Sequence, residues 1–220
     1  GYAGRMDGNW VDCAGAVLAG GLGSRMGYVD KSRLKVGGRA ILGRLLAAYR
    51  GLFAEILVSA KDPALFADLA PDPDVPAPDT ISFVPDLVEA RGSLAGLHAV
   101  LAQARAGHCF VAACDAPFVR PALIRLLRAR LRDDDDVLIP RKPDGYLEPL
   151  CAVYSKRCLP HIGEQLARGR FKIVEFFPQV RVREIAPGDV LAADPDLASF
   201  FNVNTPQELE KAQAMDPGPD

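Results

Sequence analysis

Short apolar runs alternate with amphipathic stretches along the first two thirds of the chain. Apolar runs bounded by glycine, proline or polar residues predict buried strands; they occupy residues 15–19, 55–60, 81–85, 109–114 and 137–140. Apolar residues at helical spacing predict helices; they occupy residues 40–53, 63–69, 92–106 and 121–131. This alternation predicts an α/β fold, a three-layer sandwich with a mainly parallel central sheet.

The last third of the chain has a less regular pattern. It predicts a strand at residues 147–154 and a short edge strand at residues 181–185. Residues 205–215 predict a final helix whose start carries a capping box. The residues of that start are the cap Thr205, the first helical residue Pro206, and Glu208.

Length and composition fit one globular domain. The 220 residues are 49% hydrophobic, which predicts a single domain, 1–220, with its core at about 13–214 and flexible residues at both ends. The formal charge of −2, from 26 basic and 28 acidic residues, argues against a nucleic-acid partner. No apolar run is long enough to cross a membrane. Since no signal-peptide pattern is present, we expect the protein in the cytoplasm.

Several polar groups form no pattern that requires a function. The five cysteines are expected to be buried free thiols. The scattered histidines are expected on the surface or on helices, and the acidic run 133–136 as a solvated loop rather than a cation site. A basic cluster fits either a helix end or a surface that receives an anionic acceptor. The histidines are His98, His108 and His161, and the basic cluster consists of Arg168, Arg170 and Lys172.

A glycine-rich segment, residues 20–31 (GGLGSRMGYVDK), follows the first expected strand. Glycines let the backbone approach a ligand closely, and successive free N–H groups form an anion cradle. Arg25 and Lys31 add two cations, so the segment fits a triphosphate. The spacing matches neither a P-loop nor a dinucleotide fingerprint. The alternative is a plain turn that carries surface charges.

Asp115 stands at the end of the expected strand 109–114, before Ala116 and Pro117. Ligands of parallel α/β sheets bind beyond the carboxyl ends of the strands. A carboxylate there can hold Mg²⁺, which favours one or two carboxylates together with phosphates and water. The alternative is that Asp115 caps the helix that begins near Pro121.

Two further segments carry polar candidates. Asp86 precedes the string GSLAG, residues 92–96, which fits either a nucleoside contact or a turn and a helix start. In the string FNVNTP, Asn202 and Asn204 alternate, so both point the same way in an extended chain. These two amides fit polar ligand groups, and the alternative is a strand end that leads into the final helix.

These strings resemble the signatures of the molybdenum cofactor guanylyltransferase family of Rossmann-like nucleotidyltransferases. LAGGLGSRMG with the following DK, GSLAG after Asp86, CDAPF and NVNTP stand in that family's order, and the resemblance spans residues 15 to about 213. Glu148 and Pro149 also resemble the family's acceptor-side strand. The chain differs at Tyr28 and Ser93, where relatives often carry glycine and proline.

The resemblance implies a role for each matching residue. The nucleotide is bound by Leu18, Ala19, Gly20, Gly21, Arg25, Lys31, Asp86, Gly92, Gly96 and Asp115. Arg25, Lys31 and Asp115 are the implied catalytic residues, and Asp115 holds the Mg²⁺. Asn202 and Asn204 lie on the acceptor side.

The resemblance also implies the reaction, which is transfer of GMP from GTP to the phosphate of a molybdopterin-type cofactor with release of pyrophosphate. Chaperone proteins or molybdoenzymes that receive the cofactor are the implied partners. One alternative keeps the fold and makes the protein a cytidylyl- or sugar-phosphate nucleotidyltransferase. Another is a non-catalytic nucleotide-binding cofactor chaperone.

Overall fold

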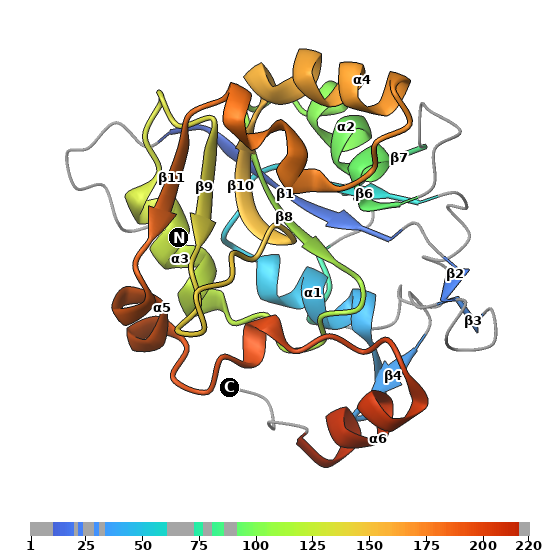
Figure 1. The fold of residues 1–220 in the computed structure, drawn as a ribbon. Helices are drawn as coiled ribbons and strands as arrows, with labels where there is room; N and C mark the ends of the chain where they lie inside the picture. Colours follow the sequence, from blue (N-terminus) through green and yellow to red (C-terminus); the bar gives the residue numbers. More distant parts are fainter. Residues whose placement is uncertain are drawn as a thin grey trace.

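The computed structural model describes residues 11–19, 22–23, 29–30, 34–60, 73–76, 81–85 and 92–215. Within them, seven strands form one sheet in the order β11-β9-β10-β8-β1-β6-β7 (Figure 1). Its strands are β1 (Cys13–Leu18), β6 (Ile56–Ser59), β7 (Ile81–Val84), β8 (His108–Ala113), β9 (Val137–Pro140), β10 (Cys151–Ser155) and β11 (Val182–Ile185). Only β10 runs antiparallel to its neighbours, so the expected mainly parallel sheet is confirmed.

Helices cover both faces of this sheet. The described helices are α1 (Ile41–Tyr49), α2 (Ser93–Gln103), α3 (Pro121–Arg130), α4 (Leu159–Ala167), α5 (Pro187–Ala193) and α6 (Pro206–Met215). Two short strand pairs, β2 (Leu22–Gly23) with β3 (Val29–Asp30) and β4 (Lys35–Val36) with β5 (Arg39–Ala40), lie outside the main sheet. No described helix is long and apolar enough to cross a membrane.

The sheet separates two hydrophobic cores, because successive strand residues face opposite sides. In β1, Cys13 and Val17 pack into the core that holds α1 and α3. Ala14, Ala16 and Leu18 pack into the core that holds α2 and α4. Figure 1 shows α2 and α4 together on one side of the sheet and α1 on the other. The three-layer sandwich expected from the sequence is therefore confirmed.

The expected elements that fall on described residues recur with bounds shifted by a few residues, and the strand expected at 147–154 begins later. Only Cys151–Ser155 forms β10, because the Cys151 N–H donates to Glu148 O at 3.1 Å and closes a turn before it. Pro149 lies in that turn and has no N–H for a ladder. The helix expected at 63–69 and the ends expected to be flexible lie outside the described residues, apart from residues 11 and 12.

The capping box at the start of α6 is confirmed. The Glu208 N–H donates to the Thr205 hydroxyl oxygen at 3.1 Å, and the Thr205 hydroxyl donates to the Glu208 carboxylate at 2.9 Å. Pro206 is the first residue of the helix. The segment that carries Asn202 and Asn204 therefore ends in a fixed helix start.

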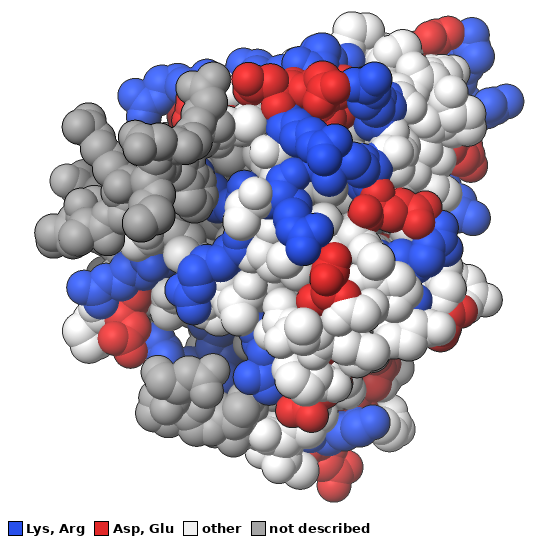
Figure 2. All heavy atoms as spheres, turned by 90° about the vertical axis from the view of Figure 1, so that its left-hand side faces the viewer, with Lys and Arg blue, Asp and Glu red and all other residues white. Residues whose placement is uncertain are grey.

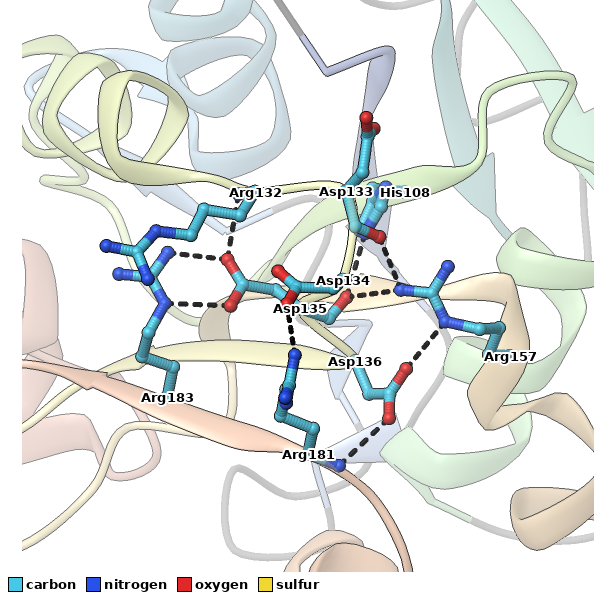
Figure 3. Close-up of polar contacts among 9 residues, drawn as sticks. All are labelled: His108, Arg132, Asp133, Asp134, Asp135, Asp136, Arg157, Arg181 and Arg183. Atoms are coloured by element: carbon cyan, nitrogen blue, oxygen red, sulfur yellow. Dashed lines mark hydrogen bonds and ion pairs between the residues drawn. The ribbon is translucent and has the colours of Figure 1, made fainter.

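The acidic run 133–136 is only in part the solvated loop expected from the sequence, because Asp133 and Asp134 are exposed, whereas Asp135 is buried and Asp136 is half-buried. Asp135 is 1% exposed and forms two contacts with the Arg183 guanidinium, at 2.8 and 2.6 Å. Asp136 accepts a hydrogen bond from the Arg157 side chain at 2.7 Å, and Asp134 pairs with Arg181 (Figure 3). Charge pairing inside the fold therefore replaces hydration of Asp135 and, in part, of Asp136.

His108 also differs from the expectation of a surface or helix position. It is the first residue of β8 and is 4% exposed. Its Nε2 lies 2.9 Å from the Asp135 carbonyl oxygen, which ties β8 to the acidic run.

On the face that carries α3 and β11, Figure 2 shows basic side chains interleaved with acidic ones. That face is an ion-paired surface rather than a patch of one charge.

Candidate active site at the carboxyl edge of the sheet

Three parallel strands end side by side at one edge of the sheet. Leu18 of β1 is paired in register with Ser59 of β6 and with Ala113 of β8. Backbone hydrogen bonds extend this pairing, from Ala19 N to Ser59 O at 2.9 Å and from Cys114 N to Leu18 O at 3.2 Å. Residues that follow these strands therefore meet in one place, where ligands of such sheets bind.

The glycine-rich segment begins at this edge. Leu18 and Ala19 are buried below it, at 4% and 5% exposure. Beyond them, β2 and β3 pair antiparallel, with Leu22 opposite Asp30, so the chain doubles back directly after β1. The other residues predicted here lie outside the described residues; they are Gly20, Gly21, Arg25 and Lys31.

Helix α2 begins at the same edge and packs tightly against the strand ends. Gly92 precedes it with a φ of 114°, a conformation that favours glycine. Gly96 lies so close to β6 that a Cβ there would stand 2.9 Å from the Ser59 Oγ and 3.4 Å from Leu18. Asp86, the other residue predicted for the nucleoside, lies outside the described residues.

Asp115 follows β8 and is half-buried at this edge. It does not cap α3, because the N-cap position there belongs to Arg120 and no side chain caps that helix. Its carbonyl oxygen accepts a hydrogen bond from Val203 N at 2.7 Å. This bond brings the segment that carries Asn202 and Asn204 to Asp115, so residues far apart in the sequence share one site.

The two asparagines flank a buried residue. Val203 is fully buried, whereas Asn202 is exposed and Asn204 is half-buried. Alternate residues of an extended segment face opposite sides, so this burial pattern fits two amides directed away from the core.

The Asp115 carboxylate is compatible with a divalent-metal site that uses few protein ligands. No group of three or more His, Cys, Asp or Glu that could hold a metal occurs among the described residues. Mg²⁺ does not need such a group, because substrate phosphates and water supply most of its ligands. A half-buried carboxylate at the carboxyl edge of the sheet is compatible with such a site.

The hairpin between β9 and β10 lies at the same edge, because β9 runs parallel to β8 (Figure 1). Lys142 and Glu148 form an ion pair there at 2.8 Å. Burial alone would lower the pKa of Lys142, but Glu148 and Asp144 outweigh burial and raise it. The hairpin therefore keeps its ammonium charge next to the carboxylate that the sequence placed on the acceptor side.

The basic cluster at the end of α4 is a helix end. Arg168 is the C-cap residue of α4 and pairs with Glu164 at 2.6 Å. A small cavity of about 30 Å³ lies beside it. Its lining residues are His161, Glu164, Gln165, Arg168, Arg170, Glu175 and Gln179.

Sequence reasoning missed two residues that hold this site together, Arg120 and Asp194. Asp194 is fully buried and lies 3.0 Å from the Arg120 Nε. No motif surrounds either residue, so the sequence carried no signal for the pair. Arg120 and Asp194 come into contact only because the fold brings distant segments of the chain together.

A mainly parallel sheet with helices on both faces, and with a carboxylate and two amides gathered beyond its strand ends, defines a nucleotide-binding α/β protein. The sequence model of the MobA-like NTP transferase domain matches residues 15–182. The chain belongs to this family.

Relatives agree over nearly the whole chain. The molybdenum cofactor guanylyltransferase of Desulfosudis oleivorans is 37% identical over 200 residues, which cover 91% of this chain and 94% of that protein. A probable molybdenum cofactor guanylyltransferase of Pelotomaculum thermopropionicum is 36% identical, covering 93% and 94%. The crystal structure of molybdopterin-guanine dinucleotide biosynthesis protein A from Archaeoglobus fulgidus superposes with a TM-score of 0.74 and 30% identity, covering 92% and 97%.

Proposed function

We propose that this protein is a molybdenum cofactor guanylyltransferase, which transfers GMP from GTP to the phosphate of a molybdopterin-type cofactor. The products are the guanine dinucleotide form of the cofactor and pyrophosphate. The observation that carries this proposal is the hydrogen bond between Val203 N and Asp115 O, 2.7 Å long. It joins the carboxylate proposed for the donor to the amides proposed for the acceptor, and relatives that match nearly the whole chain carry this activity in their names.

In the proposed arrangement, GTP lies on the turn after β1. The backbone of Leu18, Ala19, Gly20 and Gly21 cradles the triphosphate, and Arg25 and Lys31 neutralise its β- and γ-phosphates. Asp86, Gly92 and Gly96 lie along the nucleoside. The tight packing of Gly96 on Ser59 supports this role, because it brings the backbone of α2 close to the strand ends.

Asp115 would hold the divalent metal, which we propose to be Mg²⁺; bound there, the metal supplies positive charge to the phosphate oxygens. Asn202 and Asn204 orient the acceptor. A phosphate oxygen of the acceptor attacks the α-phosphorus and forms the new O–P bond, while the bond from that phosphorus to the bridging oxygen breaks and pyrophosphate leaves. The phosphate dianion is itself the nucleophile, so the protein supplies positioning and charge stabilisation rather than a general base.

The sheet that joins β1 to β11 supports a single nucleotidyltransferase domain over residues 1–220. We place the reaction in the cytoplasm, where GTP is available. We further propose that a cofactor chaperone or a molybdoenzyme receives the product.

The test is an assay of pyrophosphate release with each of GTP, CTP, ATP and UTP, with Mg²⁺ and molybdopterin. We expect release with GTP that depends on the acceptor. Release with CTP but not with GTP would show that the donor base is cytosine rather than guanine. Nucleotide binding without any release would favour a non-catalytic binding protein and overturn the proposal.

A further inference from the structure

Two segments far apart in the sequence form one unit at the carboxyl edge, the turn 115–120 after β8 and the segment 194–204. Val203 N donates to Asp115 O at 2.7 Å, and Arg120 N donates to the Ser199 hydroxyl oxygen at 2.9 Å. The rings of Phe118 and Phe201 lie 6.2 Å apart between these bonds. The position of Asp115 relative to the asparagines therefore depends on contacts between the two segments.

The buried carboxylate of Asp194 contacts both of these segments. Its Oδ1 accepts a hydrogen bond from Ala198 N at 3.1 Å, and its Oδ2 accepts one from Ser199 N at 2.8 Å. Oδ1 also lies 3.0 Å from the Arg120 Nε, in an ion pair whose carboxylate is fully buried. A buried carboxylate without such partners would be strongly unfavourable, so all of these contacts are needed at once.

The backbone between the bonds of Asp194 has an uncommon conformation. Leu197 has a φ of 53°, in the left-handed region that leucine rarely adopts. Such a conformation persists only where the surrounding contacts determine it. Asp194 supplies them, because its carboxylate binds the N–H groups directly after Leu197.

We propose that Asp194 is a positioning residue for nucleotidyl transfer. Together with Arg120, it fixes the segment that carries Asn202 and Asn204 against the turn that carries Asp115. That contact sets the alignment of the acceptor phosphate with the α-phosphorus, and small misplacements of reacting groups reduce rates strongly. The inference rests on the proposed function for the roles of Asp115 and the asparagines.

The chain provides a matched control at the opposite edge of the sheet, where β8 begins. Asp135 is also buried, at 1% exposure, and it also pairs with an arginine (Figure 3). The Arg183 side chain is 26% exposed, against 27% for Arg120. Asp135 likewise accepts a backbone hydrogen bond, from Arg132 N at 2.8 Å. Removal of either carboxylate therefore disturbs a similar buried ion pair, but only Asp194 lies beside the site.

The kinetic test compares Asp194→Asn with Asp135→Asn at a temperature well below the unfolding midpoint of both. We expect Asp194→Asn to lower kcat about tenfold or more, with the KM for GTP changed by less than about threefold. Asp135→Asn should lower the unfolding midpoint and leave kcat within about twofold. Unchanged kcat in Asp194→Asn, or an equal fall in both variants, would overturn the inference.

Three further variants keep the test decisive if Asp194→Asn fails to fold. Ser199→Ala removes only the hydroxyl that accepts the Arg120 N–H and should also lower kcat. Arg120→Lys keeps a cation beside Asp194 and should retain more of the wild-type kcat than Arg120→Ala. Wild-type kcat in Ser199→Ala, or equal kcat in both Arg120 variants, would contradict the positioning role.

Hydrogen exchange tests the same connection without any substrate. In Asp194→Asn, exchange should become faster in residues 115–120 and 198–204 together. In Asp135→Asn it should become faster near residues 132–137 and 181–183 instead. Unchanged exchange of residues 115–120 in Asp194→Asn would overturn the inference. If the wild-type protein transfers no nucleotide at all, the proposed function fails, while this exchange still decides whether Asp194 joins the two segments.

Discussion

At the scale of single residues, the account depends on one carboxylate at a strand end. Asp115 is half-buried, follows β8 directly, and is bound through its carbonyl oxygen to the acceptor-side segment. Its backbone is thus fixed at the edge of the sheet where we propose that the metal binds. Asp135 differs, because it is almost fully buried in an ion pair with Arg183.

Asp115→Asn is expected to lower kcat by about a hundredfold or more, because the amide binds Mg²⁺ weakly and the charge on the phosphates loses its counterion. Steady-state pyrophosphate release measures this change. Asp133→Asn is the control, since Asp133 is exposed and lies at the opposite edge of the sheet. Full activity of Asp115→Asn at saturating Mg²⁺ would contradict the proposal that Asp115 binds the metal.

The sequence was sufficient to find the residues that stand in local motifs. Asp115, Gly96 and the two asparagines each occur beside recognisable neighbours, and the structure brings the described ones to one edge. Asp194 and Arg120 could not be found in this way, because their roles come from contacts between segments. The burial of Asp135 in the acidic run 133–136 could not be predicted for the same reason, since the arginine partners of this run are distant in sequence.

At the scale of elements, apolar periodicity predicted the parallel part of the sheet well, because strands buried on both faces are continuous apolar runs. The antiparallel direction of β10 had no such signal, since direction depends on the length of the connection before it. Helices α4 and α5 also escaped prediction. Each contains a proline and a glycine, Pro160 and Gly163 in α4 and Pro187 and Gly188 in α5, and these residue types disfavour helices.

Gly96→Ala tests whether the close contact between α2 and the strand ends matters for GTP. The added methyl group would press on Ser59 and Leu18, so we expect α2 to move and the KM for GTP to rise several-fold. The same strain should cost about 1–3 kcal/mol in the free energy of unfolding. Nucleotide titration and denaturant unfolding measure these two effects.

Gly163→Ala is the matched control, because Gly163 also lies within a helix, α4, and an added Cβ there meets only the His98 ring at 3.8 Å. Alanine favours helix over glycine by up to about 1 kcal/mol, so this variant should be slightly more stable and bind GTP normally. If both variants behave alike, the contact at Gly96 has no special role.

At the scale of the whole molecule, ion pairs at both ends of the strands make the stability of the fold depend on pH. Burial alone would raise the pKa of Asp136, but the Arg181 N–H and the Arg157 guanidinium outweigh burial and hold that pKa below its usual range. The hydrogen bonds from Arg141 lower the pKa of Glu184 in the same way. These carboxylates therefore stabilise the fold only while they are ionised.

Asp136→Asn should be less stable than wild type by about 1–2 kcal/mol at pH 7, because it loses charged hydrogen bonds. The folded pKa of Asp136 is depressed, so its contribution is complete above the unfolded value of about 3.9 and is lost as pH falls through the folded pKa. Urea unfolding at pH 7, 4 and 3 should show the difference shrinking below about pH 4. A difference that stays constant over this range would contradict the assignment, and Asp133→Asn, at an exposed position, should show little difference at any pH.

The most direct test of the account identifies the product. The wild-type protein is incubated with GTP, Mg²⁺ and molybdopterin, and the pterin product is analysed by mass spectrometry beside an assay of pyrophosphate. The account predicts a product that carries one added GMP, formed in equal amount with pyrophosphate. An acceptor that stays unmodified while GTP is bound, or one that gains only CMP when CTP is supplied, would contradict it.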